Sequence, residues 1–333
     1  LYGAHPETVL DQLSTTLGVE LIMFSLMAAA LTALVAVNLS RPFGEIISVL
    51  HKIKNGRYDR RVRVVSNDEI GYTAEAINDM AAGLEEREQM RRSLSLAREV
   101  QQSLLPKTAP RAPNIDIAGK SLYCDETGGD FFDYILLNHH EKNLLGAVIG
   151  DVSGHGISAA LLMTSILSLL RARTILPGDP GEIVNHLNLQ IARDTEETGQ
   201  FVTLFYLEIQ PDSRSLAWVR AGHDPAYLYR SATDSFETLG GDGSALGLKA
   251  NSNYSTDSGQ AEPGDVVIMT TDGIFETRGS NEMYGRDRFL DVVRNNRRLD
   301  ATGIRDAVLG SVNDFRGRYP QEDDVTLVVV KFL

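Results

Sequence analysis

Aspartate residues recur at corners beside apolar runs of this 333-residue sequence, and most of these corners contain glycine. They lie in GGDFFD (Asp130 and Asp133), IGDVSGHG (Asp151), TTDGIFE (Asp272) and EDDVTLVVV (Asp323 and Asp324). Carboxylates supply both the oxygen ligands and the charge that hard cations such as Mg²⁺ and Mn²⁺ prefer. Several carboxylates in one place repel one another unless a cation neutralises them. The pattern therefore predicts a divalent-metal site, provided that the fold brings these corners together.

The corner at residues 150–156 lies between the apolar runs LLGAVI and ISAALLMTSILSLL. A glycine-rich turn from strand to helix is often a phosphate cradle, but this one lacks the lysine and the spacing of a P-loop. An aspartate at a strand end suits a divalent metal instead. Two or more such corners at one sheet edge would form a two-metal site, which can activate a water and hold a phosphoryl group for in-line displacement.

The elements that must position these corners begin near Asn114, where short apolar runs alternate with glycine-rich turns. Predicted strands span residues 115–124, 131–137, 144–149, 201–209, 216–221, 226–229, 266–269 and 325–332. Predicted helices span residues 157–174, 181–194, 284–295 and 301–315. Strands outnumber helices and occur in hairpin-like pairs. This favours an α/β sandwich of two antiparallel sheets flanked by helices over a doubly wound parallel sheet.

Residues 21–39 contain no charged side chain. At about 1.5 Å per residue, a helix of this length covers the roughly 30 Å core of a bilayer. A buried core helix and a signal-peptide core are the alternatives, although a basic flank would precede a signal core. Here acidic residues precede the stretch, and Arg and Lys follow it between Arg41 and Arg63. A transmembrane helix with its following side in the cytoplasm is therefore predicted, with residues 1–20 ending an extracytoplasmic region.

Residues 40–90 read as a short helix beginning near Pro42, a basic connector with Val62 and Val64 facing inward, and a second helix. The second helix carries an apolar seam with coiled-coil spacing: Ile70, Ala74, Ile77, Ala81 and Leu84. With Pro42, Glu45 and the sequence DEIG at 68–71 beside a membrane span, the segment resembles a HAMP domain. A generic amphipathic hairpin is the alternative.

A switch helix and a proline-containing linker are predicted over residues 91–113. The apolar positions of the helix are out of phase with the preceding seam: Met90, Leu94, Ala97, Gln101 and Leu104. The break near residues 85–89 is interpreted as a phase change that alters coiled-coil winding, or as an ordinary helix end. Each seam needs a partner helix to cover it, so a homodimer is expected.

The segment from about residue 94 to residue 333 resembles the PPM (PP2C-like) metal-dependent serine/threonine phosphatases, in their SpoIIE/RsbU branch. The matching stretches, in family order, are LAREVQQSLLP, GGDFFDY, GDVSGHGISAALLM, AGHDP, TDGIFE and DDVTLVVV. The resemblance implies a central β-sandwich flanked by helices, two Mn²⁺ or Mg²⁺ ions and hydrolysis of phosphoserine or phosphothreonine. The usual substrates of the family are small phosphorylated regulatory proteins of the anti-sigma-factor-antagonist type.

Carried over to this sequence, the family pattern assigns the catalytic metal ligands to four aspartates and one backbone carbonyl, that of Val152. The aspartates are Asp130, Asp151, Asp272 and Asp323. Asp151 is expected to bridge the two metals, and a water activated by both ions replaces a side-chain nucleophile. The intact set of four aspartates argues against an inactive relative.

Four further residues are secondary candidates. Asp133 and Asp324 either contact a metal, directly or through water, or cap the local backbone. His155 stands where relatives often carry Lys. A further departure from the family pattern, outside these four candidates, is Asp224 in AGHDP, where proline is common. His155 and His223 either donate a proton to the leaving serine oxygen or shape their loops by hydrogen bonding.

The combined prediction is a membrane-anchored, signal-regulated serine/threonine phosphatase in the bacterial inner membrane. Its order of membrane helix, HAMP domain and phosphatase resembles that of the SiaA-type receptor phosphatases. The predicted segments are 1–20 (extracytoplasmic), 21–39 (span), 40–90 (HAMP), 91–113 (linker) and 114–333 (phosphatase), with HAMP and phosphatase cytoplasmic.

The composition and the motifs argue against several other classes of function. The formal net charge of −13 argues against a nucleic-acid partner and against a nuclease or phosphodiesterase with a basic groove. The single cysteine, Cys124, excludes a disulfide framework. A HAMP-linked histidine kinase would need a histidine on the following helix, and residues 84–105 contain none. A non-catalytic signalling module and a two-metal phosphodiesterase remain the alternatives.

Overall fold

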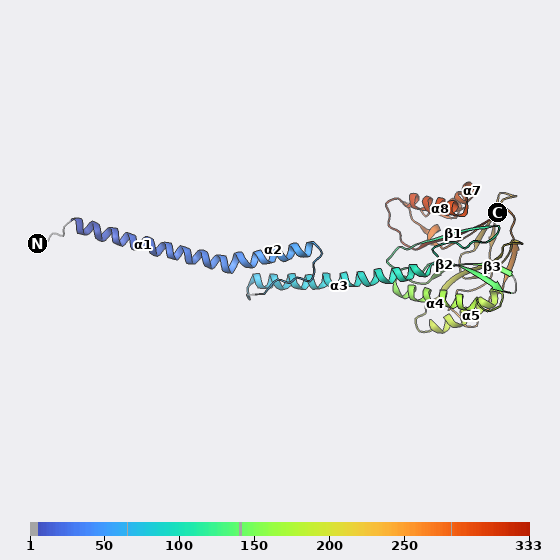
Figure 1. Ribbon diagram of the computed structural model, residues 1–333, viewed down its shortest axis with the longest axis horizontal. Helices are drawn as coiled ribbons and strands as arrows, with labels where there is room; N and C mark the ends of the chain where they lie inside the picture. The colour runs from blue at the N-terminus through green and yellow to red at the C-terminus, as the bar shows by residue number, and fades with distance from the viewer. Residues whose placement is uncertain (1–5, 65, 140–141, 281) are drawn as a thin grey trace. The chain divides into compact units, whose positions relative to one another are not determined.

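The computed structural model describes residues 6–64, 66–139, 142–280 and 282–333, and the chain divides into two compact units at Ser93 and Leu94 (Figure 1). The first five residues of the predicted extracytoplasmic segment lie outside the described residues. The N-terminal helices are α1 (Pro6–Val35), the short π-helix η1 (Ala36–Ser40), α2 (Arg41–Lys54) and α3 (Glu69–Leu104). Within the described residues, one helical stretch, Leu10–Lys54, is long and apolar enough to cross a membrane. It includes the predicted span.

In the first unit, α2 packs against the first part of α3, and their contact buries a small apolar core. Its members are Ile46, Val49, Ile53, Val62, Ala74, Ile77 and Ala81. The seam predicted for the second helix is thus covered by α2 of the same chain. The side chain of Asn78 binds both backbone polar groups of Val62, at 2.7 and 2.9 Å, and so fixes Val62 inward as predicted. Val64 is 40% exposed, so its predicted inward orientation was wrong.

Helix α3 continues without interruption through residues 85–89, where a phase change or a helix end was predicted. The intervening sequence LEEREQM consists of strong helix formers and contains no Gly or Pro, so the backbone has no reason to stop there. The second predicted seam is partly covered by the second unit: Gln101 is only 3% exposed, and Leu104 packs on a core cluster there. Met90 of the same seam is 60% exposed, so the homodimer expected from these seams stays a prediction.

The second unit is the predicted sandwich of two antiparallel sheets. One sheet has the order β1 (Ile115–Leu122), β10 (Val325–Phe332), β9 (Val266–Thr270), β6 (Ala226–Arg230) and β7 (Ser235–Leu239). The other has the order β2 (Phe131–His139), β3 (Lys142–Val152), β4 (Val202–Gln210), β5 (Ser215–Ala221) and β8 (Asp257–Gln260). The edge strands β7 and β8 were not predicted, because they are short and largely polar and therefore lack the apolar runs that mark the other strands.

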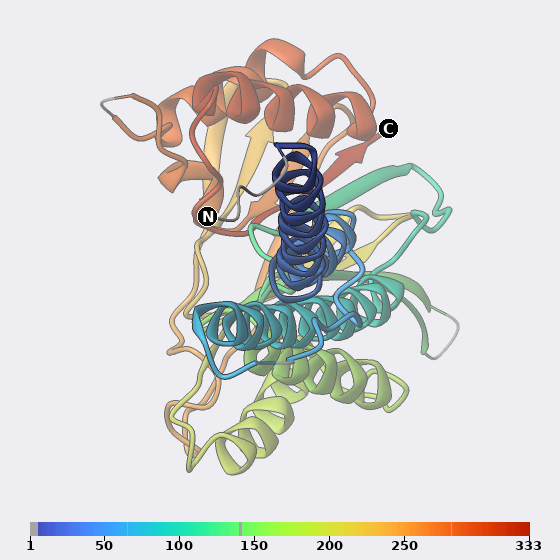
Figure 2. The ribbon, with the colours of Figure 1, turned by 90° about the vertical axis from the view of Figure 1, so that its left-hand side faces the viewer.

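Helices cover both outer faces of the sandwich (Figures 1 and 2). The helices α4 (Ile157–Arg173) and α5 (Pro180–Asp194) pack on the β2–β8 sheet. On the β1–β7 sheet lie α7 (Arg286–Asn296) and α8 (Ala301–Arg316), and the short α6 (Gly273–Glu276) follows β9. The central strands β9 and β10 are apolar along nearly their whole length because they are buried on both faces. This rigid frame fixes the ends of the strands that carry the aspartates.

Candidate metal centre

Each sheet carries acidic residues at one end. In one sheet, Phe131 of β2 pairs with Gly150 of β3, which sets Asp130 next to Asp151. In the other, β10 pairs antiparallel with β9, so the residues that follow β9 lie beside those that precede β10. This pairing brings Asp272 near Asp323 and its neighbour Asp324.

Hydrogen bonds join the ends of the two sheets. The hydroxyl of Thr271 donates to Oδ2 of Asp130 at 2.7 Å, and the backbone N–H of Gly129 donates to Oδ2 of Asp324 at 2.9 Å. Glycine is required at position 128, because a Cβ there would lie 2.0 Å from Oδ2 of Asp324. The acids of both sheets therefore meet at one site, which is the condition for the predicted metal site.

The carboxylates of this site are electrostatically unfavourable in the absence of a cation. Burial raises the pKa of Asp151 to about 7, and the charges of Asp272 and Asp323 add to the shift. Burial, with the neighbouring Asp323, raises the pKa of Asp272 to about 6. Burial is also the main cause of the raised pKa values of Asp130 and Asp323. Charges that raise one another's pKa in this way mark a site that a divalent cation would stabilise.

The available donors are oxygens, which fits Mg²⁺ or Mn²⁺. A Cβ on Gly129 would lie 2.6 Å from the carbonyl oxygen of Val152 and 3.3 Å from Oδ1 of Asp151, so both oxygens border the space beside that glycine. Among the described residues, no three His, Cys, Asp or Glu side chains converge closely enough to hold one ion. Mg²⁺ sites commonly combine one or two carboxylates with several waters, so the mixed donor set fits such an ion.

Within the residues that the structure describes, the hydrogen bonds of Asp133 are with groups other than the four aspartates proposed from the sequence. It is 3% exposed, and its Oδ2 accepts a hydrogen bond from Nε of Arg171 at 2.6 Å. Arg171 also donates to the carbonyl oxygen of Leu104 at 2.6 Å, so it ties the end of α3 to α4 and β2. These contacts favour the structural alternative for Asp133.

Asp324 holds the loop that carries Asp130. Its Oδ1 accepts the N–H of Cys124 at 2.9 Å, and its Oδ2 accepts the N–H of Gly129 at the same distance. Asp323, by contrast, is partly exposed, and its carboxylate accepts the N–H of Asp324. The adjacent acids thus have different surroundings, and those of Asp324 favour the backbone-capping alternative.

The two histidines also differ. His155 is exposed at the rim, with Nδ1 3.6 Å from Oδ2 of Asp125. His223 is 3% exposed, its Nδ1 lies 2.8 Å from the hydroxyl of Thr203, and burial lowers its pKa to about 4. A buried neutral ring in a fixed hydrogen bond is typical of a residue that shapes its loop.

Two contacts near the site were not predicted from the sequence. The amide of Gln101 donates to the carbonyl oxygen of Gly128 at 2.6 Å and accepts the N–H of the same residue at 3.3 Å. Gln101 lies in the stretch LAREVQQSLLP, and a buried polar residue among apolar seam positions was the available signal. Asp224 pairs with Arg286 at 2.6 Å, which accounts for an acid where proline is common.

Comparison with known proteins agrees with this geometry. The model of the SpoIIE family (Stage II sporulation protein E) matches residues 141–333, more than half of the chain, and that of the HAMP domain matches residues 34–86. Phosphoserine phosphatase RsbU of Bacillus subtilis (strain 168) is 25% identical over 248 residues, which cover 73% of this chain and 71% of that protein.

Solved structures show the same fold as the second unit. The SiaA-PP2C domain of Pseudomonas aeruginosa has a TM-score of 0.63 at 22% identity and covers 74% of this chain and 99% of its own. RsbX, solved in complex with magnesium, has a TM-score of 0.50 at 16% identity and covers 68% of this chain and 99% of its own.

Proposed function

We propose that this chain, which belongs to the SpoIIE family, is a metal-dependent serine/threonine protein phosphatase. The observation that carries the proposal is the meeting of two sheet ends, which brings Asp130 and Asp151 together with Asp272 and Asp323. The similarity to a phosphoserine phosphatase, RsbU, supports the reaction class.

The proposed ligands of two Mn²⁺ or Mg²⁺ ions are the four aspartates and the carbonyl oxygen of Val152. When bound, such ions supply an activated water and neutralise the charge of the phosphoryl group. Thr271 occupies Oδ2 of Asp130, and so fixes the orientation of this carboxylate. Asp324 holds the backbone of the same loop, so the ligands are held in place before an ion binds.

Of the two histidines, we assign proton donation to the leaving serine oxygen to His155. Its exposure at the rim, where its charge counteracts the raised pKa of Asp323, supports this role. The buried, neutral His223 is assigned a structural role.

The proposed setting is a bacterial inner membrane, with one span and with the HAMP and phosphatase units in the cytoplasm. The apolar stretch within Leu10–Lys54, the basic residues after it and the HAMP match support this setting. Exposed apolar side chains along α3, such as Met90, Leu96 and Val100, support a homodimer. The contact of Gln101 with Gly128 supports α3 as the element that transmits a signal to the site. The proposed substrate is a phosphorylated regulatory protein of the anti-sigma-factor-antagonist type.

The test is hydrolysis by the full chain in detergent micelles. An aryl phosphate, a bis-aryl phosphate diester, and phosphoserine and phosphothreonine peptides are offered with Mn²⁺, with Mg²⁺ and with chelator. Asp151→Asn should abolish turnover of the monoesters. Asp212→Asn is the matched control, because Asp212 is exposed at the turn after β4, at the opposite end of the strand from the site.

Metal-dependent hydrolysis of the monoesters and phosphopeptides, lost only in Asp151→Asn, supports the proposal. Preferential hydrolysis of the diester would instead favour a phosphodiesterase. Binding of Mn²⁺ without hydrolysis of any of these compounds would favour a non-catalytic signalling module.

A further inference from the structure

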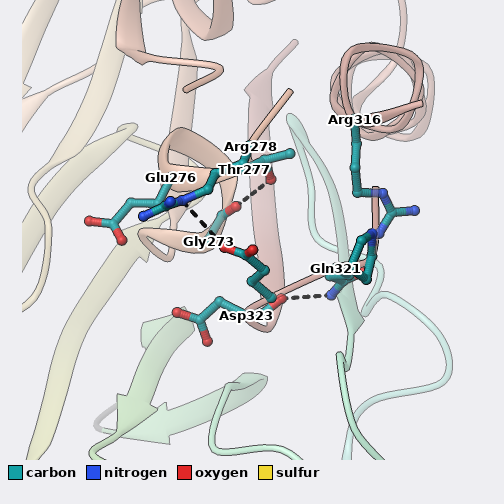
Figure 3. Close-up of a pocket in the computed structure, with 9 residues that line it drawn as sticks. Gly273, Glu276, Thr277, Arg278, Arg316, Gln321 and Asp323 are labelled. Carbon is teal, nitrogen blue, oxygen red and sulfur yellow. Dashed lines mark hydrogen bonds and ion pairs between the residues drawn. The ribbon is translucent and has the colours of Figure 1, made fainter. Parts of the chain in front are cut away.

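A small cavity of about 130 Å³ lies beside the metal centre, with Asp323 in its wall (Figure 3). Residues of α6 and the following Thr277 and Arg278 form one side, and Arg316 at the end of α8 and the segment 320–323 form the other. An engineered cavity of similar volume, about 150 Å³, takes up benzene. The space is therefore sufficient for one short polar side chain.

The charges in the wall are unequally balanced. Arg278 lies 3.3 Å from Glu322, so these two charges compensate each other. Arg316 has neutral partners: it donates to the amide oxygens of Gln321 at 3.1 Å and Asn313 at 2.8 Å. In the described part of the chain, no carboxylate lies within ion-pair distance of Arg316, so its charge is not compensated.

Two acids of the wall remain, the proposed metal ligand Asp323 and Glu276, whose charge acts on the proposed ligands. Burial and Asp323 are the larger causes of the raised pKa of Asp272, burial and Asp324 those of the raised pKa of Asp323, and in both cases the charge of Glu276 adds to the shift. A bound cation would therefore compensate Glu276 together with these ligands. The guanidinium of Arg316 is then the uncompensated charge in the cavity wall. Its planar arrangement of N–H donors matches the two oxygens of a carboxylate.

We propose that this cavity binds an acidic side chain of the substrate protein, close in sequence to the phosphorylated residue, and that Arg316 recognises its carboxylate. The inference rests on the proposed phosphatase function. Because Asp323 borders both the metal centre and the cavity, a residue in the cavity and a phosphoserine at the metals would be a few residues apart. An extended peptide advances about 3.3–3.6 Å per residue, so we expect the acidic residue one to three positions from the phosphoserine.

Arg316 also has a structural contact that the test must separate from recognition. Its partner Gln321 donates to the carbonyl oxygen of Asp323 at 2.8 Å and to that of Leu122 at 2.7 Å. If Arg316 acted only by holding Gln321, its loss would displace Asp323 and lower kcat for every substrate. If Arg316 instead recognises a carboxylate, its loss should raise KM for acidic substrates alone.

The experiment compares two phosphoserine peptides, one with Asp and one with Asn at the three positions on either side, and an aryl phosphate, all with Mn²⁺ and the full chain. We expect wild type to prefer the Asp peptide about tenfold in kcat/KM, as for a half-buried, charge-assisted hydrogen bond. Arg316→Gln should remove this preference through KM, and Arg316→Lys should retain part of it. Arg318→Gln is the matched control, because Arg318 is exposed next to α8 and does not line the cavity.

Unchanged hydrolysis of the aryl phosphate by Arg316→Gln is part of the expected result. Equal kcat/KM of wild type for the two peptides would overturn the inference and leave the proposed function intact. A uniform loss of kcat on all three substrates in Arg316→Gln would also overturn it, in favour of a positioning role. If wild type hydrolyses none of the three, the proposed function fails, and the inference fails with it.

Discussion

Replacement of Asp324 by Asn separates the two roles that the sequence left open for this acid. Asp324 is 6% exposed, and each of its oxygens accepts a different backbone N–H at 2.9 Å, from Cys124 and from Gly129. Asn offers one oxygen and one NH₂ group, so one of these two N–H groups must face another donor. The variant should therefore lose one charge-assisted hydrogen bond even when no metal is present.

A hydrogen bond to a charged group contributes about 1.5–3 kcal/mol. For a domain of this size, each kcal/mol corresponds to a change in Tm of about 2–4 °C, so the expected decrease is about 3–12 °C. Removal of the charge also relieves repulsion with Asp130 and Asp151, whose pKa values Asp324 helps to raise. Because of this relief, we expect a net decrease in Tm in the lower half of that range.

The assay is calorimetry of the full chain with chelator and then with Mn²⁺, following the transition of the second unit, with Asp212→Asn as the control for loss of one charge. Stabilisation by Mn²⁺ should persist in Asp324→Asn, because the proposed ligands remain. An unchanged Tm with chelator, together with loss of the Mn²⁺ effect, would refute the reasoning and make Asp324 a metal ligand.

Three further predictions concern the same site. In metal-free protein the folded state keeps protons on Asp151 (pKa about 7) and Asp272 (pKa about 6) at pH values at which the unfolded state has released them. The Tm measured by calorimetry should therefore fall as pH rises from about 4 to about 7, and Mn²⁺ should remove this dependence. Gly129→Ala places a methyl group 2.6 Å from a proposed carbonyl ligand and should weaken Mn²⁺ binding about tenfold or more in a titration; Gly310→Ala, with open space, should not. Asp133→Asn removes the buried carboxylate of an ion pair whose Arg171 side chain is 40% exposed, and should lower the free energy of unfolding by about 1.5–3 kcal/mol in denaturant titrations, without changing Mn²⁺ affinity.

Much of the fold could be predicted because its central strands are continuous apolar runs between glycine-rich corners. The sandwich class and the meeting of two aspartate corners within each sheet follow from pairing such runs antiparallel. The difference between Asp323 and Asp324 could not be predicted, since both precede the same strand. The N–H groups that Asp324 binds come from Cys124 and Gly129, about 200 residues earlier in the chain, and only the packing of the two sheets brings them there.

The element that packs against α3 could not be predicted from the sequence for a different reason. Apolar residues at a spacing of three and four indicate that one face of a helix is buried. The same spacing occurs whether that face packs on a second copy of the helix, on a neighbouring helix or on a sheet of the same chain. In this chain α2 covers the first part of α3, and the phosphatase fold covers Gln101. The one polar residue at a seam position, Gln101, needs hydrogen-bond partners when it is buried, and both the same residue of a second copy and a polar backbone are able to supply them. In this chain the backbone of Gly128 supplies them.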